Sequence, residues 1–226
     1  MTQPAGFDDF WSFIRLLGEH GLLKHVTLIG SWAEYIYAQS NLLPGFDANL
    51  RTLDIDFLVR NRKKPAPGIS LVSIAQEAGY ILDYDTLTEA TKIYSPGGME
   101  IEFLVHQLGQ GDKAVLETNL GVNAQALRHL SMLKEHARTV SIFGFDVFVP
   151  LPEAYALHKL IIQPMRGKKR EKDKEALHSI LPYLDPEVFH AIFADLTKNE
   201  RKTVTDQKEQ FPELLRLLTI NGQSYT

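Results

Sequence analysis

The sequence predicts a mixed α/β protein of the α+β kind, in which helices flank a mixed β-sheet and a helical part closes the chain. Two observations predict this fold class. Short, β-branched apolar segments alternate with helical periodicity as far as residue 150. From Pro152 onward, helical segments follow one another with no strand between them. We therefore expect a core at residues 1–150 and a helical C-terminal segment at residues 151–226.

Composition limits the classes of protein to which the chain can belong. Its 226 residues are 44% hydrophobic and 23% charged, as in an ordinary globular protein large enough to bury a core. The absence of cysteine excludes disulfides, thiol nucleophiles and thiolate metal sites. A net charge of −4 disfavours a dedicated duplex-DNA binder. There is no apolar run of membrane-spanning length and no signal-peptide pattern, so we expect a cytoplasmic protein without membrane contact.

The elements predicted before residue 70 follow from apolar spacing and turn residues. Phe7, Phe10 and Ile14 recur at helical spacing, and the segment HVTLI is short and β-branched. Ser31 is a suitable N-cap for the helix that follows this segment. The predicted elements are a helix at 7–19, a strand at 25–29, a helix at 31–38, a loop at 39–53, a strand at 54–59 and an exposed connection at 61–68.

Glycine and proline residues delimit the later elements. Gly79 stops a helical segment, and SPGG at residues 95–98 has the composition of a hairpin turn. Alternating apolar residues on both sides of Gly144 predict a second hairpin. The predicted elements are a helix at 70–78, strands at 80–83, 90–94 and 99–105, a helix at 124–136, a hairpin at 139–150, and helices at 152–163, 171–181, 186–195 and 211–219.

Two aspartates interrupt an apolar strand in the segment TLDIDFLV. Asp54 and Asp56 are two residues apart, so their side chains point to the same face of a strand, while Ile55 and Phe57 point to the core. Two neighbouring carboxylates repel each other, and Mg²⁺ is the natural compensating ion because it prefers oxygen ligands. The alternative is a half-exposed strand whose aspartates face water.

A later strand repeats this pattern in the segment MEIEFLV. Glu100 and Glu102 also share one face, and either one can lie beside the aspartates if the two strands are neighbours. We favour Glu102 as the third acid because it is nearer the apolar centre of the strand. The alternative is that one or both glutamates face solvent.

A Gly-Ser pair separates the first strand from the helix that follows it. Gly30 allows a ligand to approach the backbone closely, and Ser31 begins a helix whose free N–H groups favour an anion. The arrangement suits a phosphate. A plain N-cap is the more common use of such a pair.

The densest basic run is RGKKREKDKE, residues 166–175. One interpretation is that Lys159, Arg170 or Lys172 neutralises a triphosphate or an acceptor backbone. The other is a solvated start of a helix. Lys159 lies in the apolar context ALHKLII, so it must extend to solvent or pair with an acid such as Asp173. The eight histidines show no metal-ligand spacing, and we expect them to be ordinary.

The combination of these motifs resembles a known superfamily. IGS opening a helix, DID on the following strand and an acid on a later strand resemble the DNA polymerase β-like nucleotidyltransferases, whose pattern is Gly-Ser or Gly-Gly followed by Asp-x-Asp/Glu. Residues 150–177 are similar to the segment after the core in minimal bacterial nucleotidyltransferases, which include toxin-like members of abortive-infection systems. The resemblance covers residues 25–180.

The resemblance implies a nucleotidyltransferase core and a metal-dependent reaction. Such an enzyme uses Mg²⁺ or Mn²⁺ to move a nucleoside monophosphate from an NTP, such as ATP, to an acceptor. Asp54, Asp56 and Glu102 would bind the metal and act in catalysis. The residues expected to bind the nucleotide are Gly30, Ser31, Lys159, Arg170 and Lys172.

The sequence leaves the acceptor and the biological role open. A small molecule, a protein side chain and a tRNA end, and thus RNA, are all compatible with it. A non-catalytic nucleotide-binding or regulatory module on the same scaffold is the alternative to an enzyme. A further alternative is the toxin of a toxin–antitoxin pair, with an antitoxin as partner.

Overall fold

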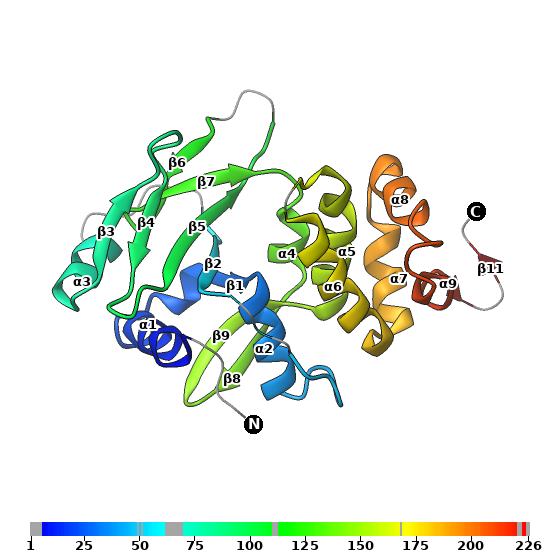
Figure 1. The fold of residues 1–226 in the computed structure, drawn as a ribbon, viewed down its shortest axis with the longest axis horizontal. Helices are drawn as coiled ribbons and strands as arrows, with labels where there is room; N and C mark the ends of the chain where they lie inside the picture. Colours follow the sequence, from blue (N-terminus) through cyan, green and yellow to red (C-terminus); the bar gives the residue numbers. More distant parts are fainter. Residues whose placement is uncertain are drawn as a thin grey trace.

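A seven-stranded mixed sheet forms one side of the molecule and a group of helices the other (Figure 1). The computed structural model describes residues 6–48, 50, 52–61, 70–109, 113–167, 169–220 and 223–224. The strands of the main sheet are β1 (Val26–Ile29), β2 (Asp54–Val59), β3 (Ile81–Tyr84), β4 (Thr91–Tyr94), β5 (Glu100–His106), β6 (Val115–Glu117) and β7 (Asn123–Leu127). This mixed α/β architecture confirms the predicted fold class.

Helices flank the sheet and continue to the C-terminus. The described α-helices are α1 (Phe7–Glu19), α2 (Ser31–Gln39), α3 (Leu71–Glu77), α4 (Ser131–Glu135), α5 (Pro152–Ile162), α6 (Arg170–Ile180), α7 (Pro186–Ala194), α8 (Lys198–Thr205) and α9 (Glu213–Leu217). Short 3₁₀ turns lie at Leu23–His25, Gln163–Met165 and Leu181–Tyr183. None of these described helices has both the length and the apolar character needed to cross a membrane.

Two separate hairpins complete the fold. The strands β8 (Ala137–Ile142) and β9 (Phe145–Pro150) pair with each other, and β9 lies against β1. The short strands β10 (Thr219–Ile220) and β11 (Gln223–Ser224) form the second hairpin near the C-terminus. The hydroxyl of Tyr37 on α2 donates to the carbonyl oxygen of Pro150 at 2.9 Å, which ties the first hairpin to the helix that follows β1.

The sheet order places β2 and β5 side by side at the centre. The order is β1-β2-β5-β4-β3, and β7 pairs with the last residues of β5 and with β6. β1 runs antiparallel to β2, and β2 runs parallel to β5. The core face of both central strands is fully buried. On this face, the rings of Phe57 and Phe103 stack with their centroids 6.1 Å apart. The opposite face of these strands is therefore the one available for a site.

The helix predicted at residues 124–136 is wrong. Residues 123–127 form β7 instead, because they satisfy the edge of β5 left free beyond β4, with Leu104 opposite Gln125. Ala124 and Ala126 face the core in strand alternation, and only residues 131–135 are helical. The alanine and leucine content favoured a helix, but a backbone partner far along the chain decided the outcome.

Other features differ from the prediction or lie outside it. The sequence missed β6, which is only three residues long, and α8, whose composition is polar. The capping box of Thr197 and Glu200 is a sequence signal that marks the start of α8. Most of the predicted connection at 61–68 lies outside the described residues. The division near residue 150 stays a prediction.

Candidate active site

The acids of β2 and β5 line one cleft at the boundary between the sheet and the helices. Asp54 and Asp56 are half-buried, whereas Ile55 between them is fully buried, as the alternation of a strand requires. The parallel register sets Asp54 opposite Glu100 and Asp56 opposite Glu102. Glu102 lines the cleft together with both aspartates, and Glu100 does not. The pairing of β2 with β5 thus places Glu102 at the site.

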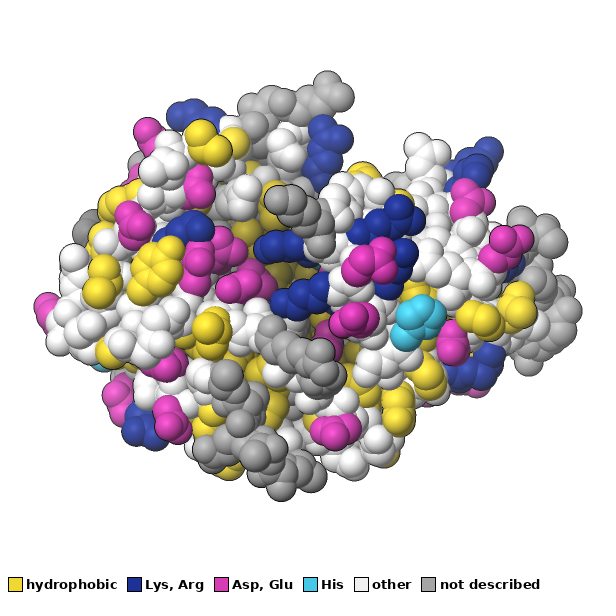
Figure 2. All heavy atoms as spheres, in the orientation of Figure 1, with side chains coloured by type: hydrophobic (Ala, Val, Ile, Leu, Met, Phe, Trp, Pro, Cys, Tyr) yellow, Lys and Arg dark blue, Asp and Glu magenta, His cyan; other side chains and the backbone are white. Residues whose placement is uncertain are grey.

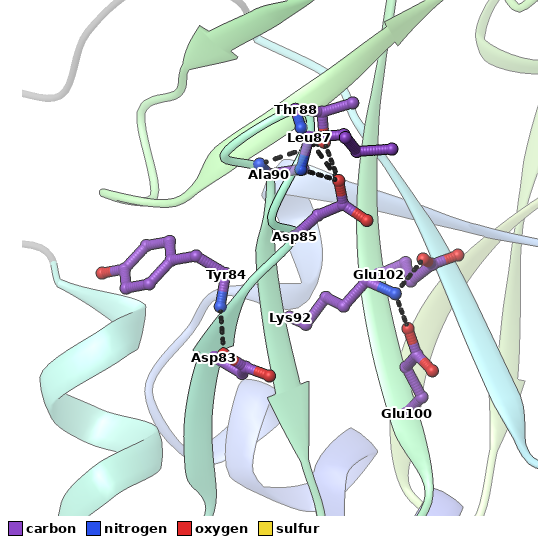
Figure 3. A network of polar contacts seen from close by, with 9 residues as sticks. All are labelled: Asp83, Tyr84, Asp85, Leu87, Thr88, Ala90, Lys92, Glu100 and Glu102. Carbon is purple, nitrogen blue, oxygen red and sulfur yellow. Dashed lines mark hydrogen bonds and ion pairs between the residues drawn. The ribbon is translucent and has the colours of Figure 1, made fainter.

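A lysine from the neighbouring strand holds both glutamates (Figure 3). Lys92 on β4 lies opposite Glu102, and its Nζ pairs closely with Glu100 and reaches Glu102 Oε1 at 3.5 Å. The hydrogen bond to Glu100 is the main cause that raises the pKa of Lys92, so this lysine stays charged. Lys92 therefore compensates the glutamates and leaves the aspartate pair to other cations. Lys92 was not among the residues predicted from the sequence.

Gly30 stands directly against Asp56 because β1 and β2 pair with Ile29 opposite Asp56. Its φ of 71° lies in the region that favours glycine, and α2 begins at the next residue. A Cβ at this position would overlap Asp56 Oδ2 and lie 3.3 Å from its Cγ. Gly30 is also the N-cap of α2, so the prediction that Ser31 is the N-cap is wrong. Ser31 is the first helical residue and lines the cleft.

Replacing Gly30 with Ala is expected to reduce both stability and nucleotide binding. Alanine at this φ costs about 1–3 kcal/mol in the free energy of unfolding, and its methyl group must displace the carboxylate of Asp56. Urea unfolding and NTP titration calorimetry measure the two effects. Gly79→Ala is the matched control, since Gly79 has a φ of 86° but open space around its Cα. Nucleotide binding at the wild-type level in Gly30→Ala would contradict a phosphate site at this turn.

The helical side of the cleft is basic. Figure 2 shows Lys and Arg side chains next to a group of acidic ones near the middle of this face, where the surface is hollowed. The cationic residues that line the cleft are Lys159, Arg166, Lys169 and Lys172. Arg170, which the sequence analysis assigned to nucleotide binding, is exposed and is not among the lining residues. Arg166 and Lys169 occupy the cleft wall in its place.

A buried carboxylate organises this basic wall. Asp173 on α6 is 2% exposed, and it accepts from Lys159 Nζ at 2.7 Å and from Arg166 at 3.4 Å. The predicted pairing of Lys159 with an acid is therefore present. The Lys159 ammonium also lies over the ring of Tyr155 at 5.1 Å, and the Tyr155 hydroxyl donates to the buried Glu34 on α2. These contacts connect α2, α5 and α6 behind the cleft.

The electrostatics of the cleft favour a bound cation on the strand side. Burial is the main cause that raises the pKa of Asp56, and the charge of Asp54 raises it further, while Lys169, Arg166 and Lys159 oppose the shift. Burial also raises the pKa of Glu102, with Asp56 as the next cause. Both carboxylates are therefore costly to ionise in the protein alone, and a positive ion beside them reduces that cost.

The donor set of the cleft fits a divalent ion only in part. In the described part of the chain, no group of three or more His, Asp or Glu side chains is arranged to hold a metal ion by itself. Two carboxylates on one strand face do fit Mg²⁺, which usually takes one or two carboxylates and completes its coordination with substrate phosphates and water. Asp54 and Asp56 are thus the residues that could hold the ion.

An apolar hollow of about 340 Å³ adjoins the charged cleft. The two spaces share Gly30 and Asp56 as common lining residues. Apolar atoms make up most of the surface of the hollow, whose lining also includes Tyr155, His129 and His158. Both belong to the histidines expected to be ordinary, and the sequence carries no spacing signal that identifies them, since they come from separate elements.

The chain matches a known protein family over most of its length. A family model described as Nucleotidyltransferase matches residues 9–201. Among curated proteins, no sequence matches the chain.

Two solved structures are similar to this chain over most of its length. The crystal structure of an antigenic nucleotidyltransferase-like protein from Paracoccidioides brasiliensis is 16% identical, with a TM-score of 0.52, over 93% of this chain and 92% of that chain. The solution structure of the antibiotic-resistance factor ANT(2'')-Ia is 8% identical, with a TM-score of 0.41, over 90% of this chain and 95% of that chain. The first likeness shows a shared fold.

Proposed function

Because this chain belongs to the nucleotidyltransferase family whose model its residues 9–201 match, we propose that it transfers a nucleoside monophosphate from an NTP to an acceptor hydroxyl. In this reaction the hydroxyl oxygen bonds to the α-phosphorus. The bond from that phosphorus to the bridging oxygen breaks, and pyrophosphate leaves with the electron pair. The proton of the hydroxyl passes to a carboxylate of the site.

The two sides of the cleft have complementary parts in this proposal. Gly30 and the N-terminus of α2 bind the phosphates through backbone N–H groups, which favour anions. The four cationic side chains of the opposite wall neutralise the triphosphate. Asp54 and Asp56 hold Mg²⁺ or Mn²⁺. The bound ion would supply charge neutralisation and orientation of the phosphate oxygens.

Glu102 serves as the third acid of the proposed site. It faces the cleft beside Asp56, and burial raises its pKa, so it accepts a proton more readily than an ordinary carboxylate. Lys92 lies 3.5 Å from Glu102 and keeps the side chain oriented across the strands. Phosphoryl and nucleotidyl transfer depend mainly on such positioning and charge neutralisation.

One observation carries the proposal: Asp56 lies directly against the glycine that opens α2, with a wall of four lysine and arginine side chains across the cleft. Acids that bind a cation and bases that bind an anion thus line one cleft of about 150 Å³. The alternative, a half-exposed strand whose aspartates face water, does not account for the basic wall opposite these acids.

A non-catalytic nucleotide-binding module is the second candidate function. Lys92 already neutralises Glu100 and approaches Glu102, and the described residues hold no three-acid metal group. A module of this kind would bind NTP in the same cleft without transferring any part of it. ATP binding, a partner antitoxin and a cytoplasmic location stay predictions from the sequence, and RNA stays one of the acceptors compatible with it.

The decisive experiment measures NTP binding by calorimetry and the transfer of label from NTP to an acceptor. The protein is incubated with each α-labelled NTP, Mg²⁺ and cell extract, and pyrophosphate is measured in parallel. We expect label in one acceptor, an equal amount of pyrophosphate, loss of transfer in EDTA and recovery on adding Mg²⁺ or Mn²⁺. NTP binding without transfer would favour the non-catalytic module. Absence of NTP binding would contradict both candidates.

A further inference from the structure

The apolar hollow beside the charged cleft has the size of a pocket for a small molecule. Its volume of about 340 Å³ lies in the range of ligand pockets in proteins, whereas the charged cleft holds only about 150 Å³. Leu127, Leu133 and Ile162 form part of its wall, and most of its surface is apolar. A ligand with an apolar body fits this surface better than a fully hydrated one.

The hollow meets the charged cleft at the reacting end of the proposed site. Asp56 and Gly30 line both spaces, and so do Lys159 and Arg166. A molecule in the hollow therefore abuts the position where the α-phosphate lies against the aspartates. This is the place from which an acceptor hydroxyl can reach the phosphorus.

His129 gives the hollow a fixed polar group. Its Nδ1 donates to Glu200 Oε1 at 2.7 Å, and Glu200 is itself fixed by the capping box of α8. This bond leaves Nε2 as the nitrogen that can serve a ligand, and in the neutral ring Nε2 accepts a hydrogen bond from a hydroxyl group. His129 also has a φ of 63°, which is uncommon outside glycine and is often found at functional sites.

The charges around the hollow select against a cationic ligand. Arg128, Lys159 and Arg166 line it, and Asp56 is its only carboxylate among the described lining residues. His158 adds no charge, because burial, followed by the charges of Lys159 and Arg166, lowers its pKa to about 3. The hollow therefore suits a neutral or anionic molecule and disfavours a polycation.

We infer that the acceptor is a small, partly apolar molecule, neutral or anionic, that binds in this hollow and presents a hydroxyl group between His129 and Asp56. This inference rests on the proposed function and names its acceptor class. His129 accepts a hydrogen bond from a second polar group of the acceptor and thereby positions it, while the proton of the reacting hydroxyl passes to a carboxylate of the site. The nucleoside of the NTP is the competing occupant of the hollow, and the second test below separates the two.

The first test asks which class of molecule receives the label. The protein is incubated with α-labelled NTP and Mg²⁺ together with total RNA, with protein, or with the low-molecular-weight filtrate of the same extract. We expect label only in a compound from the filtrate. Label in RNA or protein would overturn the acceptor class while leaving the proposed function intact. Label in no fraction would overturn the proposed function and this inference with it.

The second test fills the hollow. Ile162→Trp places an indole in the space, and we expect transfer to the filtrate compound to fall about tenfold or more through a higher KM for that compound. NTP affinity, measured by calorimetry, should change by less than about twofold. Leu215→Trp is the matched control, since Leu215 is 58% exposed on α9. A parallel loss of NTP affinity in Ile162→Trp would show that the hollow holds the nucleoside and would overturn the inference.

The third test isolates His129. Asparagine tolerates positive φ and retains a short polar side chain, but it has no group in the place of Nε2. We expect His129→Asn to raise the KM for the acceptor with NTP affinity unchanged. His20→Asn is the control, because His20 is exposed at the end of α1. An unchanged KM in His129→Asn, with the fold intact by circular dichroism, would overturn the assignment of this residue.

Discussion

Replacing Asp56 with Asn is expected to abolish nucleotidyl transfer, with a loss of about 10³-fold or more. Asp56 is the one carboxylate that lies against Gly30, beside Asp54 and Glu102, and between the charged cleft and the hollow. Asparagine has nearly the same shape, so the cleft should keep its form while losing the charge that holds the metal ion. Transfer of label from NTP measures the effect.

The same substitution is expected to stabilise the protein in the absence of metal. Burial raises the pKa of Asp56 in the folded state, so the folded protein binds the proton more tightly than the unfolded chain does. The contribution of this group to stability is therefore present below its unfolded pKa and is lost as the pH rises through its folded pKa. Asn does not ionise, so the loss should be absent in Asp56→Asn.

Unfolding by urea at acidic and neutral pH, with EDTA present, tests this expectation. The wild-type protein should lose stability relative to Asp56→Asn as the pH rises through the range above the ordinary Asp pKa. Asp83→Asn is the matched control, because Asp83 is exposed on β3 and is not among the residues that line the cleft. Transfer of label at the wild-type rate by the Asp56→Asn protein would contradict the central role of Asp56.

Replacing Asp173 with Ala is expected to produce the largest loss of stability, about 3–5 kcal/mol in the free energy of unfolding. The substitution removes the buried partner of Lys159, which is itself only 8% exposed, and leaves an ammonium group without a carboxylate. The pair with Arg166 adds little, since that side chain is 38% exposed. Chemical denaturation measures the loss.

A second variant separates stability from function at this position. The double substitution Lys159→Met with Asp173→Leu replaces both charges with apolar groups of similar volume, so stability should return to near the wild-type value. The affinity of the double variant for NTP should be lower than that of the wild type, because the cleft has lost the ammonium group of Lys159. Glu175→Ala is the control, as an exposed acid on the same helix. Wild-type stability in Asp173→Ala would contradict the buried pair.

The elements that the sequence predicted correctly are those with a strong local pattern. Helix α1 follows from apolar residues at helical spacing, and the hairpin of β4 and β5 follows from the turn at residues 95–98. The helix predicted at 124–136 failed because residues 123–127 find their partner in β5, which lies about twenty positions earlier in the chain. Local propensity carries no information about such a partner.

Strand alternation alone indicates which residues can form an acidic face, because it places Asp54 with Asp56 and Glu100 with Glu102. It also located the glycine turn before α2. Contacts in the folded protein place Glu102 rather than Glu100 in the lining of the cleft, together with Arg166 and Lys169 rather than Arg170. The roles of these residues stay predictions.

The physical reason is the range of the interactions involved. Backbone periodicity acts over a few residues and can be recognised in one sequence. Strand register and helix docking join segments far apart in the chain, and these long-range contacts set which glutamate meets Asp56 and which cations face it. They also bring His129 within 2.7 Å of Glu200, a residue that lies 71 positions further along the chain.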